Sequence, residues 1–269
     1  MSIKLGAIGG GVMGEALISR LIDRKIYSAA EILVSDLQEP RREFLRQKYQ
    51  IQVSANNQDA LAATEVLLLA VKPQVLDTVV SSLGNLTQVK NRPLIISILA
   101  GVTLEKLATC FPEYPVIRAM PNTPAIVGAA MSAIATGKNV EQQHISTALS
   151  IFEAIGEVVE VSESLMDAVT GLAGSGPAYV ALAIEALADG GVAAGLPRAV
   201  ASQLALQTVL GTAKLIEVSQ LHPAQLKDRV TSPGGTTIAG VAALEQAGFR
   251  SALIEAVKAA YQRSRELGS

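Results

Sequence analysis

Residues 9 to 14 read Gly-Gly-Gly-Val-Met-Gly, a G-x-G-x-x-G pattern that constrains the fold more than any other feature of the chain. The pattern follows the apolar run 3–8 and leads into the amphipathic stretch 15–23. Between a strand and a helix, Gly9 permits a tight turn, Gly11 lets the backbone approach a pyrophosphate, and Gly14 lets the helix pack on the strand. We therefore predict a dinucleotide site, with an ordinary glycine-rich turn as the alternative.

The length and charge of the chain restrict its class. Its 269 residues exceed the usual single core, so two medium domains are expected. With 22 basic and 24 acidic residues, it has no charge excess that would favour nucleic acid or an anionic membrane, and we expect a small-molecule ligand. No segment of the sequence resembles a membrane span, because the apolar stretches are interrupted by proline, glycine or polar residues. The single cysteine, Cys110, and the lack of a signal-peptide pattern favour a cytoplasmic protein.

The two halves of the chain differ in their patterns. Up to about residue 162, short apolar runs alternate with helical patterns, which predicts an α/β fold with a Rossmann-like, doubly wound, mainly parallel sheet. After Ser164 the chain reads as helices only. We therefore predict a dinucleotide-binding domain at 1–162 and an all-helical domain at 163–269. The predicted strands are 3–8, 32–35, 66–71, 94–98, 116–119, 131–135 and 158–161, and the predicted helices of the second half are 177–194, 197–218, 223–230, 235–247 and 249–267.

The first of these late helices is apolar on nearly every face. Between Tyr179 and Ala188 only Glu185 is charged. Such a helix either lies deep inside the helical domain or is covered by a second chain, and the small size of the domain favours the second chain. We expect a homo-oligomer.

The end of the second predicted strand bears on the choice of nucleotide. Asp36 is placed to accept hydrogen bonds from an adenosine ribose and to repel a 2′-phosphate, which favours NAD. Against this, Ser35 offers a hydroxyl, and Arg41 and Arg42 follow close enough to meet a phosphate. A loop or helix-capping role for Asp36 is the alternative, and the choice between NADPH and NADH stays open.

Other strand ends contribute further candidates. Lys72 is either a solvated surface lysine or a contact of the pyrophosphate or ribose. The small residues at 97–101 leave room for a nicotinamide ring, and Asn122 lies in a rigid Pro-Asn-Thr-Pro loop that could also be purely structural. The predicted cofactor-binding residues are Gly9, Gly11, Val12, Met13, Gly14, Ser35, Asp36, Ala70, Val71, Lys72, Pro73, Ala100, Gly101 and Asn122.

A second anion site is predicted in the helical half, where residues 231–237 read Thr-Ser-Pro-Gly-Gly-Thr-Thr before a helix. Small residues there expose backbone N–H groups, and hydroxyls add neutral donors, so the loop suits a carboxylate. A capped helix start without a ligand is the alternative. The predicted substrate-binding residues are Ser232, Gly234, Gly235 and Thr236, followed by Thr237.

Other reactive side chains are not assigned a role. His144 and His222 lie in helical, surface-like contexts without a neighbouring relay partner. No His/Cys cluster indicates a metal site, and Cys110 lacks the neighbours that activate a thiolate.

Taken in order, these motifs resemble the pyrroline-5-carboxylate reductase family over essentially the whole chain. Besides the glycine loop, the resemblance rests on Ala-Val-Lys-Pro at 70–73, Ile-Arg-Ala-Met-Pro-Asn-Thr-Pro at 117–124 and Gly-Ser-Gly-Pro-Ala-Tyr at 174–179. It also includes Asp-Gly-Gly at 189–191 with Gly-Leu-Pro-Arg at 195–198. The stretch 226–237 is its most specific part.

The resemblance implies the last step of proline biosynthesis, in which 1-pyrroline-5-carboxylate is reduced to L-proline by hydride transfer from NADPH or NADH. It also implies that the 232–237 loop binds the substrate carboxylate and that Thr237 is the catalytic residue that reaches the ring nitrogen. Members of the family form dimers, or assemblies of dimers, through interlaced C-terminal helices. Many relatives have a hydroxyl residue where this chain has Asp36.

Two other classes of function compete with this interpretation. β-Hydroxyacid dehydrogenases of the 6-phosphogluconate type share the glycine loop and a Gly-x-x-Gly-Ser-Gly segment, but they need a lysine and an asparagine where this chain has Val180 and Ala183. A non-catalytic dinucleotide sensor is the other candidate. A sensor of this kind would not need the second anion site at 232–237, which argues against it.

Overall fold

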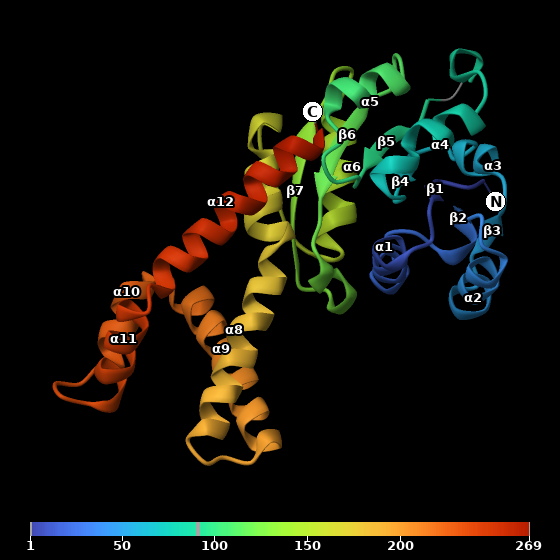
Figure 1. Ribbon diagram of the computed structural model, residues 1–269. Helices are drawn as coiled ribbons and strands as arrows, with labels where there is room; N and C mark the ends of the chain where they lie inside the picture. Colours follow the sequence, from blue (N-terminus) through green and yellow to red (C-terminus); the bar gives the residue numbers. More distant parts are fainter. Residues whose placement is uncertain (1, 90–91, 269) are drawn as a thin grey trace. The chain divides into compact units, whose positions relative to one another are not determined.

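The computed structural model describes residues 2–89 and 92–268 (Figure 1). The chain forms two compact units. The first, which we call the sheet unit, comprises the chain up to Ser175 together with the segment from Ala259 onward. The second, the helical unit, comprises Gly176–Lys258.

The sheet unit is built on one eight-stranded sheet with the order β3-β2-β1-β4-β5-β6-β7-β8. All neighbouring strands pair in parallel except β6 and β7, which are antiparallel. The predicted doubly wound, mainly parallel architecture is therefore confirmed. The strands are β1 (Leu5–Ile8), β2 (Ile32–Ser35), β3 (Gln52–Ser54), β4 (Val66–Leu69), β5 (Leu94–Ser97), β6 (Val116–Met120), β7 (Ala130–Thr136) and β8 (Gly156–Glu160).

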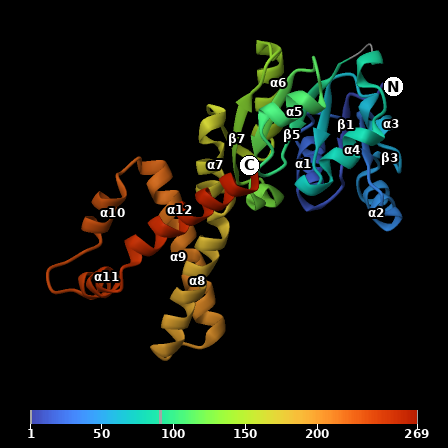
Figure 2. The same cartoon turned by 45° about the horizontal axis from the view of Figure 1, so that its top comes forward.

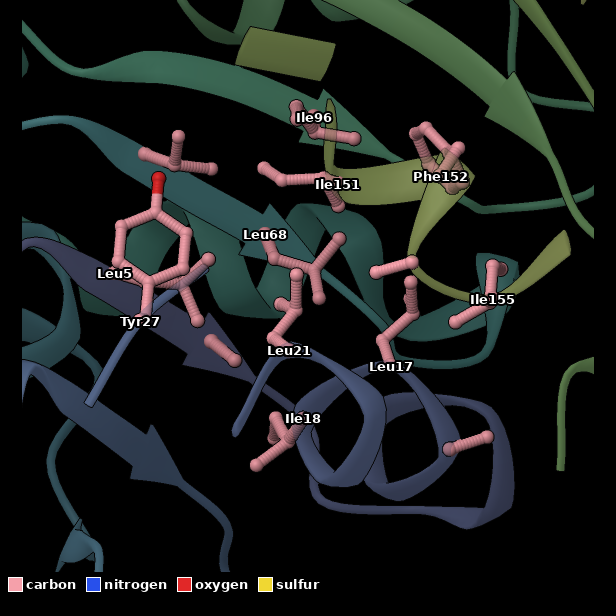
Figure 3. Packing of buried hydrophobic residues seen from close by; sticks show 14 of the residues in the cluster. Leu5, Leu17, Ile18, Leu21, Tyr27, Leu68, Ile96, Ile151, Phe152 and Ile155 are labelled. Carbon is pink, nitrogen blue, oxygen red and sulfur yellow. The ribbon is translucent and has the colours of Figure 1, made fainter. Parts of the chain in front are cut away.

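The central strands are apolar throughout because helices cover both faces of the sheet. In β4, Leu68 packs with α1 (Val12–Asp23) and α6 (Gln142–Glu153) on one face, as Figure 3 shows for its neighbours Leu21 and Phe152. Leu67 and Leu69 point to the opposite face. There they join α3 (Asn57–Leu61), α4 (Leu76–Ser82) and α5 (Leu104–Cys110). This alternation follows from the two-residue period of a strand.

One strand, β3, was not predicted. It has only three residues, pairs only with β2 among the described strands, and contains no fully buried residue. It follows α2 (Glu39–Tyr49), whose C-cap residue Gln50 has a φ of 58° in the left-handed region. A short edge strand without a buried face leaves little pattern in a sequence.

The helical unit contains α8 (Gly176–Ala193), α9 (Arg198–Ser219), α10 (Pro223–Arg229), α11 (Thr236–Gln246) and the first part of α12 (Phe249–Gly268). α8 and α9 lie side by side (Figures 1 and 2) and pack through the small residues Ala188, Ala201 and Ala205. Their larger apolar side chains stay exposed in the single chain, among them Leu182, Leu187, Leu204, Leu210 and Leu215.

Two helical stretches among the described residues are long and apolar enough to cross a membrane by length and composition alone. They are Glu163–Ala193 and α9, so the prediction that no segment resembles a membrane span was wrong for these two. The finding is weak evidence for a membrane, because a helix that is covered by another protein surface has the same composition.

Candidate active site

The glycine loop after β1 is shaped by two glycines that no other residue can replace without strain. Gly9 has a φ of +99°, and a Cβ on it would lie 2.6 Å from the carbonyl oxygen of Ala70. A Cβ on Gly14 would lie 2.5 Å from the carbonyl oxygen of Gly9, so α1 could not pack as closely on the loop. Both positions therefore require glycine for the local fold.

Gly11 is different, because the local fold does not require it. Its φ is −65°, which any residue adopts, and a Cβ built on it would meet no protein atom within 4 Å. Gly11 caps the N-terminus of α1, where the first N–H groups have no helical partner and the helix dipole is positive. The space in front of this loop therefore fits a pyrophosphate, which needs close approach to the backbone.

A cavity of about 420 Å³ opens beside the loop at the carboxyl ends of β1, β2 and β4. This edge of an open parallel sheet is where such folds bind ligands. Its lining contains the predicted residues Gly9, Gly11, Ser35, Asp36, Ala70, Val71 and Lys72, together with Ile8, Leu37, Gln38, Asn57, Val75, Thr78, Val79 and Ser82.

The polar side chains at the end of β2 already form hydrogen bonds within the chain. Ser35 is buried, and its hydroxyl donates to Asn57 Oδ1 at 2.7 Å. The Asp36 carboxylate accepts from two backbone N–H groups, those of Gly10 and Gln38, at 2.9 Å each. Lys72 is exposed and forms no ion pair with any residue that the structure describes.

The two arginines that follow Asp36 do not reach its carboxylate. Arg41 donates to the carbonyl oxygen of Gly10 and pairs with the Glu15 carboxylate on α1. Arg42 Nη1 donates to the backbone oxygens of Asp36 and Leu37, at 2.9 Å each. The guanidinium groups therefore brace the glycine loop and the loop after β2.

The Glu15 carboxylate lies at the centre of these contacts and interacts with Arg41, Lys48 and Tyr49. Burial alone would raise the pKa of its carboxyl, but hydrogen bonds from Tyr49, Arg41 and Lys48 outweigh burial and lower the pKa to about 2. Tyr49 Oη lies 2.7 Å and Lys48 Nζ 3.0 Å from Glu15 Oε1. The carboxylate is therefore charged at neutral pH and holds Arg41 in place.

A second cavity of about 260 Å³ shares Ala70 and Val71 with the first. It extends past the ends of β5 and β6, so the two cavities lie next to each other along the sheet edge, which we call the path, with the glycine loop beside it. Its lining consists of Met13, Ala70, Val71, Ile98, Met120, Pro121, Asn122, Thr123 and Gly174.

Asn122 holds the wall of the second cavity together. Its Nδ2 donates to the carbonyl oxygen of Ala173 at 3.0 Å, and its Oδ1 accepts from the Met131 N–H at 3.0 Å. Ala173 belongs to a widened helical turn, Thr170–Gly174, of the kind that often lies at functional sites. The Asn122 side chain thus has a structural role while its loop lines the cavity.

Five predicted cofactor residues line neither cavity, and one of them, Gly14, instead lets α1 pack closely on the glycine loop. Val12 is exposed on the first turn of α1, and Pro73 begins the short helical turn before α4. Ala100 is exposed, and Gly101 packs against the end of α12, where a Cβ on Gly101 would lie 3.5 Å from the Gly268 nitrogen. The loop after β5 instead contributes Ile98.

Several lining residues were missed from the sequence. Ile98 and Met120 end predicted strands or follow them directly, so their position was a usable signal. Asn57 and Ser82 lie on α3 and α4, and their side chains are hydrogen-bonded to each other at 2.9 Å. Only tertiary packing brings these two to the cavity, and nothing in their local sequence marks them.

The predicted anion loop of the helical unit is preformed. Gly234 has a φ of +65°, and Gly235 caps the eleven-residue helix α11. A Cβ on Gly235 would lie 2.2 Å from Ser232 Oγ, so a larger residue there would displace the Ser232 hydroxyl. The hydroxyls of Ser232, Thr236 and Thr237 have no hydrogen-bond partner among the described residues. Free donors at a helix N-terminus suit an anion.

The histidines and the cysteine have ordinary roles. His222 Nδ1 accepts from the Ala224 N–H at the start of α10, and His144 Nδ1 accepts from the Glu141 N–H at the start of α6. Burial raises the pKa of the Cys110 thiol, so the thiol is not activated.

The fold, the glycine loop and the strand-edge cavities define a protein of the Rossmann-like dinucleotide-binding class. Two family models match parts of the chain. Residues 4–101 match the NADP oxidoreductase, coenzyme F420-dependent family, and residues 163–267 match the pyrroline-5-carboxylate reductase dimerisation domain.

Full-length relatives narrow the class. A pyrroline-5-carboxylate reductase of Synechocystis sp. is 64% identical, over 100% of this chain and 99% of the relative. The solved pyrroline-5-carboxylate reductase of Coxiella burnetii has a TM-score of 0.91 and 34% identity, covering 99% of both chains. That of Plasmodium falciparum, solved with NADP bound, has a TM-score of 0.88 and 32% identity, covering 99% of this chain and 98% of its own. The chain belongs to the pyrroline-5-carboxylate reductase family.

Proposed function

We propose that this protein reduces 1-pyrroline-5-carboxylate to L-proline with NADPH or NADH, the last step of proline biosynthesis, as a cytoplasmic enzyme. The observation that carries the proposal is the preformed loop at the start of α11, with Gly234, Gly235 and three hydroxyls that have no hydrogen-bond partner within the described part of the chain. A dinucleotide site alone fits any dehydrogenase, whereas the second anion site matches a substrate that carries a carboxylate. The full-length relatives support the same reaction.

The path along the sheet edge would hold the cofactor. Its adenosine half fits the cavity that Asp36 lines, its pyrophosphate the space before Gly11, and its nicotinamide half the cavity that Asn122 lines. When bound, the nicotinamide supplies a hydride. The chain itself contributes position: the cavity walls orient the ring and exclude water from one face. We also propose Val12, Gly14, Pro73, Ala100 and Gly101 as cofactor contacts that lie outside the linings of the two cavities.

In the substrate loop, the backbone N–H of Thr236 and the hydroxyls of Ser232 and Thr236 would hold the carboxylate. The Gly235 N–H instead donates to the Ser232 carbonyl oxygen at 3.0 Å and closes the loop. We propose that the Thr237 hydroxyl contacts the ring nitrogen. It donates to a neutral imine nitrogen, or accepts from the N–H of an imine that is already protonated. A protonated imine needs only an aligned hydride donor, so the reaction does not require a strong acid in the protein.

The experiment is the initial rate of NADPH and NADH oxidation with 1-pyrroline-5-carboxylate. We compare wild type with Thr237→Ala, Thr237→Ser and a control, Thr109→Ala, whose hydroxyl lies on the exposed side of α5. Thr237→Ala should lose about 10-fold to 100-fold in kcat/KM, Thr237→Ser should retain most activity, and the control should match wild type. Cofactor binding without imine reduction in the wild type would favour the sensor instead.

We also propose a homodimer or an assembly of dimers, formed through the helical domain at 163–269, with the dinucleotide-binding domain at 1–162. The exposed apolar side chains of α8 and α9 and the match to a dimerisation domain support this. A molar mass from light scattering equal to one chain at micromolar concentration would contradict it.

A further inference from the structure

We propose that Asp36 makes this protein select NADH over NADPH, an inference that rests on the proposed use of a nicotinamide dinucleotide. The selection has two parts. The carboxylate is fixed at the adenosine end of the path, and the nearby guanidinium groups are committed elsewhere.

The position of the Asp36 carboxylate is set by the backbone. Oδ2 accepts from the Gly10 N–H and Oδ1 from the Gln38 N–H, at 2.9 Å each. A carboxylate has about four acceptor positions, so about two remain for hydroxyl donors. The 2′- and 3′-hydroxyls of an unphosphorylated ribose are such donors. A 2′-phosphate offers negative oxygens instead, which the carboxylate repels.

The cations that could offset this repulsion point to other partners. Arg41 pairs with Glu15 and with the carbonyl oxygen of Gly10, and Arg42 donates to two backbone oxygens. Neither arginine lines the cavity. Because the Glu15 carboxylate is also bonded to Lys48 and Tyr49, releasing Arg41 would break up a larger cluster.

Among the described residues that line this cavity, Lys72 is the only cation, and it lies on a different side from Asp36. It follows β4, whereas Asp36 follows β2, and β1 lies between them. Two strand spacings amount to about 10 Å. Lys72 is therefore placed for the pyrophosphate side of the path rather than for a 2′-phosphate beside Asp36.

The test is the dissociation constant of NAD⁺ and of NADP⁺, measured by titration calorimetry at fixed ionic strength. Because like charges about 4 Å apart cost more near a protein surface than in water, wild type should bind NAD⁺ about 5-fold to several hundred-fold more tightly. Asp36→Asn removes the charge at nearly constant shape. The ratio of the NADP⁺ dissociation constant to that of NAD⁺ should then fall toward one. Glu39→Gln, an equal charge change at the exposed start of α2, should leave the ratio unchanged.

A second variant keeps Asp36 and its bonds intact. Leu37 is 83% exposed and lines the cavity, so Leu37→Arg adds a cation without disturbing the core. NADP⁺ affinity should rise relative to NAD⁺ affinity, because the added guanidinium attracts the 2′-phosphate. Unchanged NADP⁺ affinity in both variants would overturn the proposal, as would equal or tighter binding of NADP⁺ by wild type.

The failure of this inference and that of the proposed function are distinguishable. Imine reduction together with tighter NADP⁺ binding would refute the role of Asp36 and leave the reaction standing. Tighter NAD⁺ binding without imine reduction would support Asp36 and refute the reaction.

Discussion

Ser264 on α12 donates a hydrogen bond of 2.7 Å from its Oγ to Asp167 Oδ1 on α7 (Met166–Val169), 97 residues earlier in the chain. Asp167 also lies 3.8 Å from Nη2 of the buried Arg118 on β6, and Arg118 Nη1 lies 3.3 Å from Glu163. Glu163 in turn accepts from the Leu104 N–H at the start of α5. This cluster fastens the last part of α12 to the sheet unit.

We predict that Ser264→Ala lowers the free energy of unfolding by about 1–2 kcal/mol, because it removes a nearly buried hydrogen bond to a carboxylate. Urea denaturation followed by circular dichroism measures this. Ser146→Ala is the matched control, since its hydroxyl donates to the Gln142 carbonyl oxygen on the exposed side of α6. It should change the free energy of unfolding by less than about 0.5 kcal/mol. Equal effects would contradict a special role for Ser264.

We predict that Arg118→Met lowers the free energy of unfolding by about 3 kcal/mol, more than Ser264→Ala does. The variant leaves Glu163 and Asp167 without their buried cation. Urea denaturation followed by circular dichroism measures this loss of unfolding free energy. Arg46→Met breaks an exposed pair with Glu43 and should cost less than about 1 kcal/mol. A small loss for Arg118→Met would mean that solvent satisfies both carboxylates.

Glu15 predicts a pH dependence. Its folded pKa is lowered to about 2 from an ordinary value of 4.5, so its contribution to stability is complete above about pH 4.5 and is lost as the pH falls toward 2. Reduced for solvent screening, the contribution is about 1–2 kcal/mol. The stability difference between wild type and Glu15→Gln should therefore be constant from pH 5 to pH 8 and shrink below about pH 4.5. If the stability difference between wild type and Glu15→Gln instead grew as the pH fell, the lowered pKa of Glu15 would be contradicted.

The glycine loop separates folding from binding. Gly11→Ala should change the free energy of unfolding by no more than about 1 kcal/mol, because its Cβ meets no protein atom, yet it should weaken nicotinamide dinucleotide binding by about 10-fold or more. Gly9→Ala should instead destabilise the fold, since it combines a positive φ with a backbone clash. Thermal unfolding and titration calorimetry on both variants check the contrast. Unimpaired binding by Gly11→Ala would move the pyrophosphate away from this loop.

Much of this molecule could be predicted from its sequence. Strands buried on both faces, such as β4, leave a continuous apolar run, and the long helices α8 and α9 begin at Gly or Pro signals. The glycine loop and Asp36 were predictable because fixed spacing from a strand determines their position.

The rest depends on tertiary contacts. Asn57 and Ser82 reach the first cavity only because α3 and α4 pack side by side, and no local pattern encodes that meeting. The sequence likewise gives no sign that Arg118 is buried and paired with residues 45 and 49 positions later. Gly101 follows a strand as a nucleotide contact would, but its neighbour is the C-terminal turn of α12.

The most direct measurement is the product itself. The wild-type protein is incubated with 1-pyrroline-5-carboxylate and a limiting amount of NADH or NADPH, and proline is quantified by chiral chromatography against the cofactor oxidised. We predict L-proline in a one-to-one ratio to oxidised cofactor, with no D-proline. Cofactor oxidation without proline, or no oxidation with either cofactor, would contradict the proposed reaction.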